Sequence, residues 1–176
     1  MDGTPINIKS LRPNINEMKE LDNPGIYKWW APQEKMLEIL KKMNVELRAI
    51  ENEIETKSIE SQKLYCIYVG QAKNLKDRLK NHIGGSIRNS TLRKSLGAIL
   101  WNGEDSDGLK KKINKFMDDF FVEYEQVDEF DLDRIESSEI RSRLRIFNIE
   151  GFNHESFEKY IEEPLSKLRA DLKAEK

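Results

Sequence analysis

Two short apolar segments carry tyrosines, and a basic segment follows the second one. The first, Gly-Ile-Tyr, ends at Tyr27, and the second, Tyr-Val-Gly, begins at Tyr68; Arg78 and His82 follow ten and fourteen residues after Tyr68. A guanidinium presents a planar fork of donors that fits a phosphate, and an imidazole exchanges protons near neutral pH. A phenol, with a free pKa of about 10, becomes a base only beside positive charge. Together these side chains indicate proton transfer next to a bound phosphate.

The order of the two tripeptides, with Arg78 and His82 at these offsets, resembles the GIY-YIG nuclease family; Val69 stands where the family has isoleucine. The resemblance implies a metal-dependent DNA endonuclease that hydrolyses phosphodiester bonds. It implies catalytic roles for four residues, Tyr27, Tyr68, Arg78 and His82. The alternative is a non-catalytic DNA-binding or regulatory module that retains the nuclease fold. A protein built for interaction through a helix, with coincidental motifs, is a third and weaker interpretation.

A helix behind the second tyrosine must position Arg78 and His82. Its predicted apolar stripe consists of Leu75, Leu79 and Ile83. Arg78 and His82 fall along the border of that stripe, one turn apart, so both are expected to face one cleft. Asn74 is the expected N-cap, with Asp77 three residues later.

The resemblance also implies one divalent cation, magnesium or manganese, held by a glutamate on a helix after the third strand. We expect this helix over residues 131–147, with Glu136, Glu139 and Arg143 inside its broad apolar face. A charge there is costly unless it is paired or bound to a cation. Glu139 and Arg143 have the spacing of an ion pair, which leaves Glu136 as the predicted metal ligand and Glu139 as the alternative. Oxygen ligands suit magnesium or manganese.

Relatives also carry an asparagine beyond this helix. Asn148 and Asn153 both fit, and the sequence does not choose between them. The chain has two histidines and one cysteine, Cys66, which argues against a zinc site and against an internal disulfide.

Apolar alternation predicts strands near residues 25–30, 64–70 and 120–124. Helices are expected over residues 74–83, 90–101, 131–147 and 155–173. The expected fold class is α+β, and the resemblance implies a small three-stranded mixed sheet flanked by helices. The expected organisation is an N-terminal arm (1–22), a nuclease-like domain (23–150) with a helical insertion (31–62), and a C-terminal helix (151–176).

The insertion contains a heptad-like stripe of apolar residues: Met36, Leu40, Met43, Leu47, Ile50 and Ile54. It predicts a long helix over residues 33–56. Such a helix could fold back on its own domain or pair with a second copy, and a homodimer would place two sites on one duplex.

The net charge of −2 hides an uneven distribution. Seven basic residues and one acidic residue lie between Lys73 and Lys94, so we expect a basic side near the motifs, as DNA binding requires. The segment from Ser90 to Gly97 is a candidate for backbone contacts or an ordinary amphipathic helix. No apolar run is long enough to span a bilayer, and a cytoplasmic protein is expected.

Overall fold

The structure is a computed structural model that describes residues 3–148 and 157–174. Its sheet has five strands in the order β1-β5-β2-β4-β3, and every pairing between neighbouring strands is antiparallel. In chain order the strands are β1 (Ile6–Asn7), β2 (Gly25–Pro32), β3 (Thr56–Ile59), β4 (Gln62–Ala72) and β5 (Phe121–Gln126). The expected α+β class holds, but the expected three-stranded mixed sheet is wrong.

The three predicted strands are β2, β4 and β5, and the two missed strands lie at the edges of the sheet. β1 pairs with β5 through only two residues, too few to give a periodic signal. β3 forms a hairpin with β4 through Glu60 and Ser61, which both have positive φ, 46° and 70°. Such turns usually contain glycine or asparagine. The usual sequence signal for this hairpin is therefore absent.

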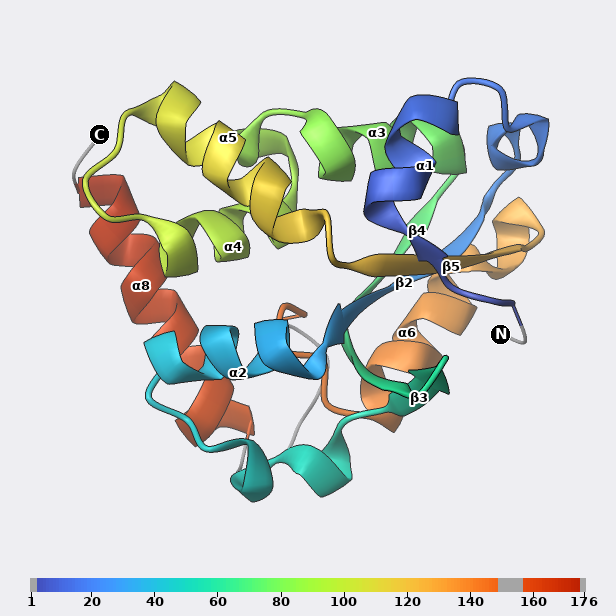
Figure 1. The fold of residues 1–176 in the computed structure, drawn as a ribbon. Helices are drawn as coiled ribbons and strands as arrows, with labels where there is room; N and C mark the ends of the chain where they lie inside the picture. The colour runs from blue at the N-terminus through green and yellow to red at the C-terminus, as the bar shows by residue number, and fades with distance from the viewer. Residues whose placement is uncertain (1–2, 149–156, 175–176) are drawn as a thin grey trace.

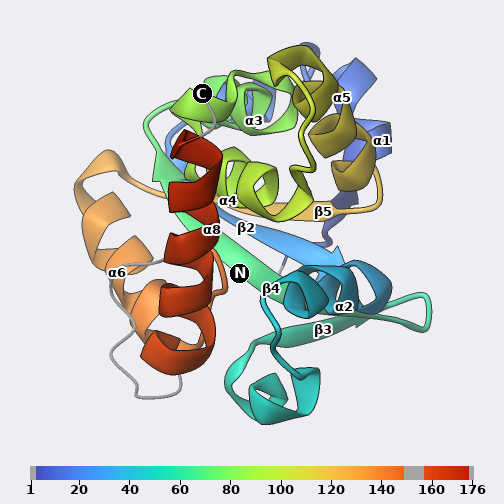
Figure 2. The same ribbon diagram turned by 90° about the vertical axis from the view of Figure 1, so that its left-hand side faces the viewer.

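Helices cover both faces of the sheet (Figures 1 and 2). They are α1 (Ile8–Asn14), α2 (Gln33–Lys42), α3 (Leu75–Gly84), α4 (Thr91–Leu100), α5 (Ser106–Met117), α6 (Leu132–Ser142) and α8 (Glu163–Ala174). Short helical turns are η1 (Lys19–Asp22), η2 (Leu47–Ala49), η3 (Glu51–Glu53), η4 (Ile87–Asn89), η5 (Glu129–Asp131) and η6 (Glu158–Glu162).

Side chains alternate between two cores along β2. Tyr27 and Trp29 point into the large core shared with α1 to α5. Ile26 and Trp30 point into a smaller core with Leu132 of α6. Both faces of β2 are therefore buried, which explains its nearly continuous apolar sequence.

The predicted helix over residues 33–56 is wrong in length. α2 ends at Lys42, and Asn44 adopts φ 57°, the left-handed conformation that closes many helices. Val45 N donates to Leu40 O at 2.9 Å and completes this C-terminal cap. The chain then returns through η2 and η3.

The apolar stripe folds back on its own domain, one of the two arrangements left open. Five of its six residues, Met36, Leu40, Met43, Ile50 and Ile54, are buried in the large core, and Leu47 packs against it. The possible homodimer through a helix over 33–56 is not shown, and the side chains that would form its interface are already covered within one chain.

Candidate active site

Strand pairing places the two tyrosine motifs side by side. Tyr27 of β2 lies opposite Gly70 of β4. A Cβ at position 70 would lie 2.3 Å from the Tyr27 hydroxyl, so only glycine leaves room for the phenol. A Cβ at Gly25 would lie 2.3 Å from the carbonyl oxygen of Glu125. The glycine in each tripeptide therefore has a steric role.

Regular strand pairing places Tyr68 on the same face as Tyr27. Gly70 lies opposite Tyr27 and Tyr68 lies opposite Trp29, so each strand advances by two residues, which returns a side chain to the same face. Tyr27 and Tyr68 therefore share the large core, with ring centroids 6.2 Å apart. The register shifts only beyond Trp29, where β4 contains one additional residue, Ile67. This bulge reverses the alternation of the following residues, so that Tyr65 also enters the large core.

Helix α3 brings Arg78 and His82 to the tyrosines. Asn74 caps the helix by accepting a hydrogen bond from Asp77 N at 2.9 Å, as predicted. Arg78 Nε donates to the Tyr27 hydroxyl at 3.0 Å. The same hydroxyl lies 2.8 Å from His82 Nε2. Tyr27 is thus held between a guanidinium and an imidazole.

His82 lies deeper than its predicted place at the border of the apolar stripe, because its ring is fully buried. Its second nitrogen, Nδ1, lies 2.7 Å from Ser90 Oγ, which also caps α4 by accepting from Arg93 N. Both ring nitrogens therefore have partners, Tyr27 on one side and Ser90 on the other. Ser90 begins the segment that was expected either to contact the DNA backbone or to form an ordinary amphipathic helix. Its link to His82 depends on the N-terminus of α4 lying beside the end of α3, where Arg93 Nη1 also donates to His82 O at 3.0 Å.

Burial keeps this cluster uncharged, apart from Arg78. Burial and the neighbouring Tyr68 raise the pKa of Tyr27 well above its usual value, against the opposing effect of Arg78. Burial also raises the pKa of Tyr68, again opposed by Arg78. Burial, followed by the positive charge of Arg78, lowers the pKa of His82 well below its usual value. At neutral pH the two phenols are protonated and the imidazole is neutral.

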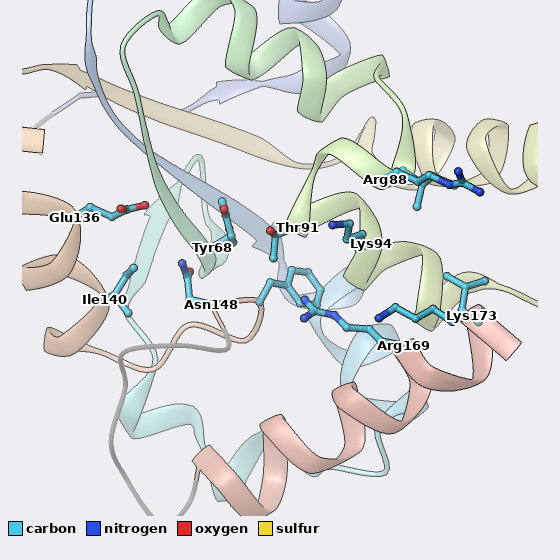
Figure 3. A pocket seen from close by; sticks show the side chains of 12 residues that line it. Tyr68, Arg88, Thr91, Lys94, Glu136, Ile140, Asn148, Arg169 and Lys173 are labelled. Atoms are coloured by element: carbon cyan, nitrogen blue, oxygen red, sulfur yellow. The ribbon is translucent and has the colours of Figure 1, made fainter. Parts of the chain in front are cut away.

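Tyr68 lines a cleft of about 880 Å³ that lies between α4, α6 and α8. Figure 3 shows Glu136 of α6 on one side of it and the basic residues of α4 and α8 on the other. Tyr27 lies behind Tyr68, fully buried. Of the two tyrosines, Tyr68 is therefore the one in contact with the cleft.

Glu136, the predicted metal ligand, lies on the wall of this cleft. Gln71 Nε2 donates to Glu136 Oε2 at 2.9 Å and to Asp133 Oδ1 at 2.5 Å. Burial raises the pKa of Glu136; the Gln71 hydrogen bond lowers it and Asp133 raises it.

Among the described residues no group of three or more histidine, cysteine, aspartate or glutamate side chains could hold a metal ion. A single carboxylate facing a wide cleft still suits magnesium, which keeps several waters and takes other ligands from phosphate oxygens. The donor set therefore fits a divalent cation held by Glu136 together with the substrate.

The chain matches the family model described as the GIY-YIG catalytic domain over residues 25–171. The chain belongs to the GIY-YIG nuclease family. Neither a curated protein nor a solved structure matches it. In the part of the chain that the structure describes, no helix is both long and apolar enough to cross a membrane.

Asn148 of this GIY-YIG domain completes the edge of the sheet. Its Oδ1 accepts from Val69 N and its Nδ2 donates to Val69 O, both at 2.8 Å. Phe147 N donates to Ile67 O at 2.9 Å, next to the bulge. Asn148 thus supports the strand that carries Tyr68 and also lines the cleft. Asn153, the other candidate, lies outside the described residues.

Glu139, the alternative metal ligand, is occupied elsewhere. It forms ion pairs with Lys28 at 2.8 Å and with Arg145 at 3.6 Å. The predicted pair with Arg143 is wrong, because α6 ends at Ser142 and Arg143 has an extended backbone. The prediction that Glu139 is paired is confirmed with different partners.

The basic wall of the GIY-YIG cleft comes from three elements: Arg88 of η4, Lys94 of α4, and Arg169 and Lys173 of α8. Thr91 and Lys94 belong to the segment predicted as a candidate backbone contact. Arg169 and Lys173 were missed, because nothing local in the sequence shows that the C-terminal helix packs against α4 (Figure 2).

Proposed function

We propose that this protein is a metal-dependent DNA endonuclease. The observation that carries the proposal is the position of Arg78. Its guanidinium holds the buried Tyr27 hydroxyl and also interacts with Tyr68, which lines the cleft facing Glu136. This brings an anion-binding group, a phenol and a carboxylate to one place.

Arg78 would bind the scissile phosphate through its planar donor fork. Its Nε donates to Tyr27, and its Nη1 makes only a long contact of 3.5 Å with Asn89 O, which a phosphate oxygen could replace. Negative charge develops on these oxygens during hydrolysis, and a preorganised cation stabilises it. Tyr68 would orient the attacking water at the cleft surface. A cation held at Glu136 would supply positive charge beside the phosphate. The same charge would lower the pKa of the attacking water.

His82 would hold Tyr27 in one of two hydrogen-bonding states. If Nδ1 carries the proton and donates to Ser90, Nε2 accepts from the Tyr27 hydroxyl; in the other tautomer Nε2 donates to Tyr27. Only the first state lets Tyr27 pass a proton to the imidazole. His82 thereby controls whether Tyr27 acts as a donor or only as an acceptor.

Incubation of the purified protein with supercoiled plasmid, with and without magnesium, tests the function. Wild-type protein should nick or linearise the plasmid only with the metal present. Arg78→Ala should lose on the order of a hundredfold or more in rate, the scale for one preorganised charge stabiliser. Glu136→Gln should lose metal-dependent cleavage, whereas Glu139→Gln should keep it.

The same assay separates the alternative, a non-catalytic DNA-binding module. That module would retard DNA in gels without cutting it under any divalent cation. Near-normal cutting by Arg78→Ala would remove this arginine from the mechanism.

A further inference from the structure

Arg169 lies in the cleft without an ion-pair partner among the described residues. It is partly buried on α8 and lines the same cleft as Tyr68 and Glu136. One terminal nitrogen, Nη2, donates to Ser95 Oγ of α4. Its Nε is buried and has no hydrogen-bond partner in the described part of the chain. A half-buried cation with an unused donor is costly unless an anion arrives.

The surrounding charge favours an anionic ligand. The cleft is lined by four basic side chains, Arg88, Lys94, Arg169 and Lys173, and by one carboxylate, Glu136. Burial lowers the pKa of Arg169, and Tyr68 opposes that effect, which places Arg169 in electrostatic reach of Tyr68. Arg78 interacts with Tyr68 in the same way. A phosphate bound at Tyr68 would therefore meet two arginines, one from α3 and one from α8.

We propose that Arg169 binds a phosphate of the substrate strand beside Tyr68, with Lys173 and Arg88 contacting the backbone at the rim. Figure 3 shows Arg169 and Lys173 reaching from α8 into the cleft opposite Glu136. The C-terminal helix is thus part of the substrate site. This inference rests on the proposed nuclease function and deepens it, because it identifies which wall of the cleft holds the DNA backbone.

Fluorescence anisotropy with a labelled DNA duplex, in EDTA and over a range of salt concentrations, tests the proposal without cleavage. Each phosphate neutralised on B-DNA adds about 0.9 to the slope of log affinity against log salt. Arg169→Gln should bind about tenfold more weakly, equal to about 1.4 kcal/mol, and should reduce the slope by about 0.9. An excess of inorganic phosphate should compete poorly; strong competition would mean a free-phosphate site and would overturn the proposal.

Two matched variants distinguish phosphate binding by Arg169 from a purely structural role of this residue. Lys167→Gln removes an exposed cation on the same helix but away from the cleft, and it should leave affinity and slope unchanged. Ser95→Ala removes the contact between Arg169 and α4, together with one local hydrogen bond from Ser95 Oγ to Thr91 O, and leaves Arg169 in place. If the arginine merely ties α8 to α4, Ser95→Ala should weaken DNA binding as much as Arg169→Gln does, and the proposal fails.

A folded Arg169→Gln variant with wild-type affinity and slope would also overturn the proposal. If that variant does not fold, the double variant Arg88→Gln with Lys173→Gln, which changes two exposed residues, decides. A smaller slope of log affinity against log salt would support phosphate binding at the basic wall of the cleft, and an unchanged slope would reject it. Failure of wild-type protein to bind or cut DNA would instead refute the nuclease function. The two failures are therefore distinguishable.

Discussion

The cluster around Tyr27 combines neutral acid–base groups with one arginine, Arg78. Tyr27 and His82 are fully buried and share a hydrogen bond, and Arg78 is the cation that contacts Tyr27. Burial disfavours the charged form of each titratable group. The tyrosines therefore remain protonated until additional positive charge reaches the cleft. This dependence provides a physical reason for a divalent cation in the proposed reaction.

His82 should make folding stability depend on pH. Its lowered pKa means that the unfolded chain takes up a proton near pH 6.5 while the folded protein does not. Stability should therefore be complete above this pH and fall as the pH decreases, with a slope of up to about 1.4 kcal/mol per unit from this group. Urea unfolding of wild type and His82→Gln between neutral and mildly acidic pH measures the difference. Parallel curves for the two proteins would contradict the prediction.

Glu139 should matter for stability and not for cleavage. Lys28 is almost fully buried, and Glu139 and Glu55 neutralise it. Glu139→Gln should cost about 1–3 kcal/mol, because a buried charge loses one of its partners. Arg143→Gln is the matched control, since the exposed Arg143 should contribute within about 0.5 kcal/mol. Thermal melting and the plasmid assay on both variants check the prediction, and equal melting temperatures would refute it.

At the scale of elements, the site depends on the fit between β2 and β4. Regular pairing of Tyr27 with Gly70 and of Trp29 with Tyr68 puts both tyrosines on one face, and Gly70 leaves space for the Tyr27 ring. Asn148 and Phe147 hold the other edge of β4 at the same point. The second tripeptide therefore acts as a structural support for the first, beyond the hydroxyl that it contributes.

Gly70→Ala should displace Tyr27 and damage activity. The added methyl would overlap the Tyr27 hydroxyl and ring, so the variant should lose about 1–3 kcal/mol of stability and most cleavage. Gly84→Ala is the control, because a Cβ there meets nothing within 4 Å at the end of α3. It should be neutral or stabilising by up to about 1 kcal/mol. Normal cleavage by Gly70→Ala would show that the strand pair adjusts without moving the tyrosine.

At the scale of the whole molecule, segments distant in sequence close around one sheet. The N-terminal strand β1 pairs with β5, the returning chain after α2 fills the large core, and α8 packs against α4. The cleft lies where β4, α4, α6 and α8 approach one another (Figures 2 and 3). One wall thus comes from α6 and the other from α4 and α8, which flank α6 in the sequence and meet only in the folded chain.

Leu40→Glu should unfold the protein and not dissociate a dimer. Leu40 is 1% exposed in the large core, so a charge there should cost about 3 kcal/mol or more. Leu37, on the same helix, is 46% exposed, and Leu37→Glu should melt like wild type. Melting curves and analytical ultracentrifugation of all three proteins check the prediction. A folded Leu40→Glu monomer derived from a wild-type dimer would instead support a dimer interface on this helix.

The sequence alone determined the features that depend on neighbouring residues. It predicted the capped helix from Asn74 and the three central strands, because capping and the apolar period act over a few positions. The order of the two tripeptides can be read from it directly. The resemblance named Arg78 and His82 before any geometry was available.

Only the tertiary structure decided which charged side chains pair with one another and where helix α2 ends within the apolar stripe. Glu139 pairs with Lys28, more than a hundred residues away, and Arg169 reaches the cleft only because α8 crosses α4. The left-handed turn at Asn44 ends α2 although the apolar spacing continues beyond it. Such outcomes depend on which buried surfaces meet, and contacts between distant segments leave no local pattern in the sequence.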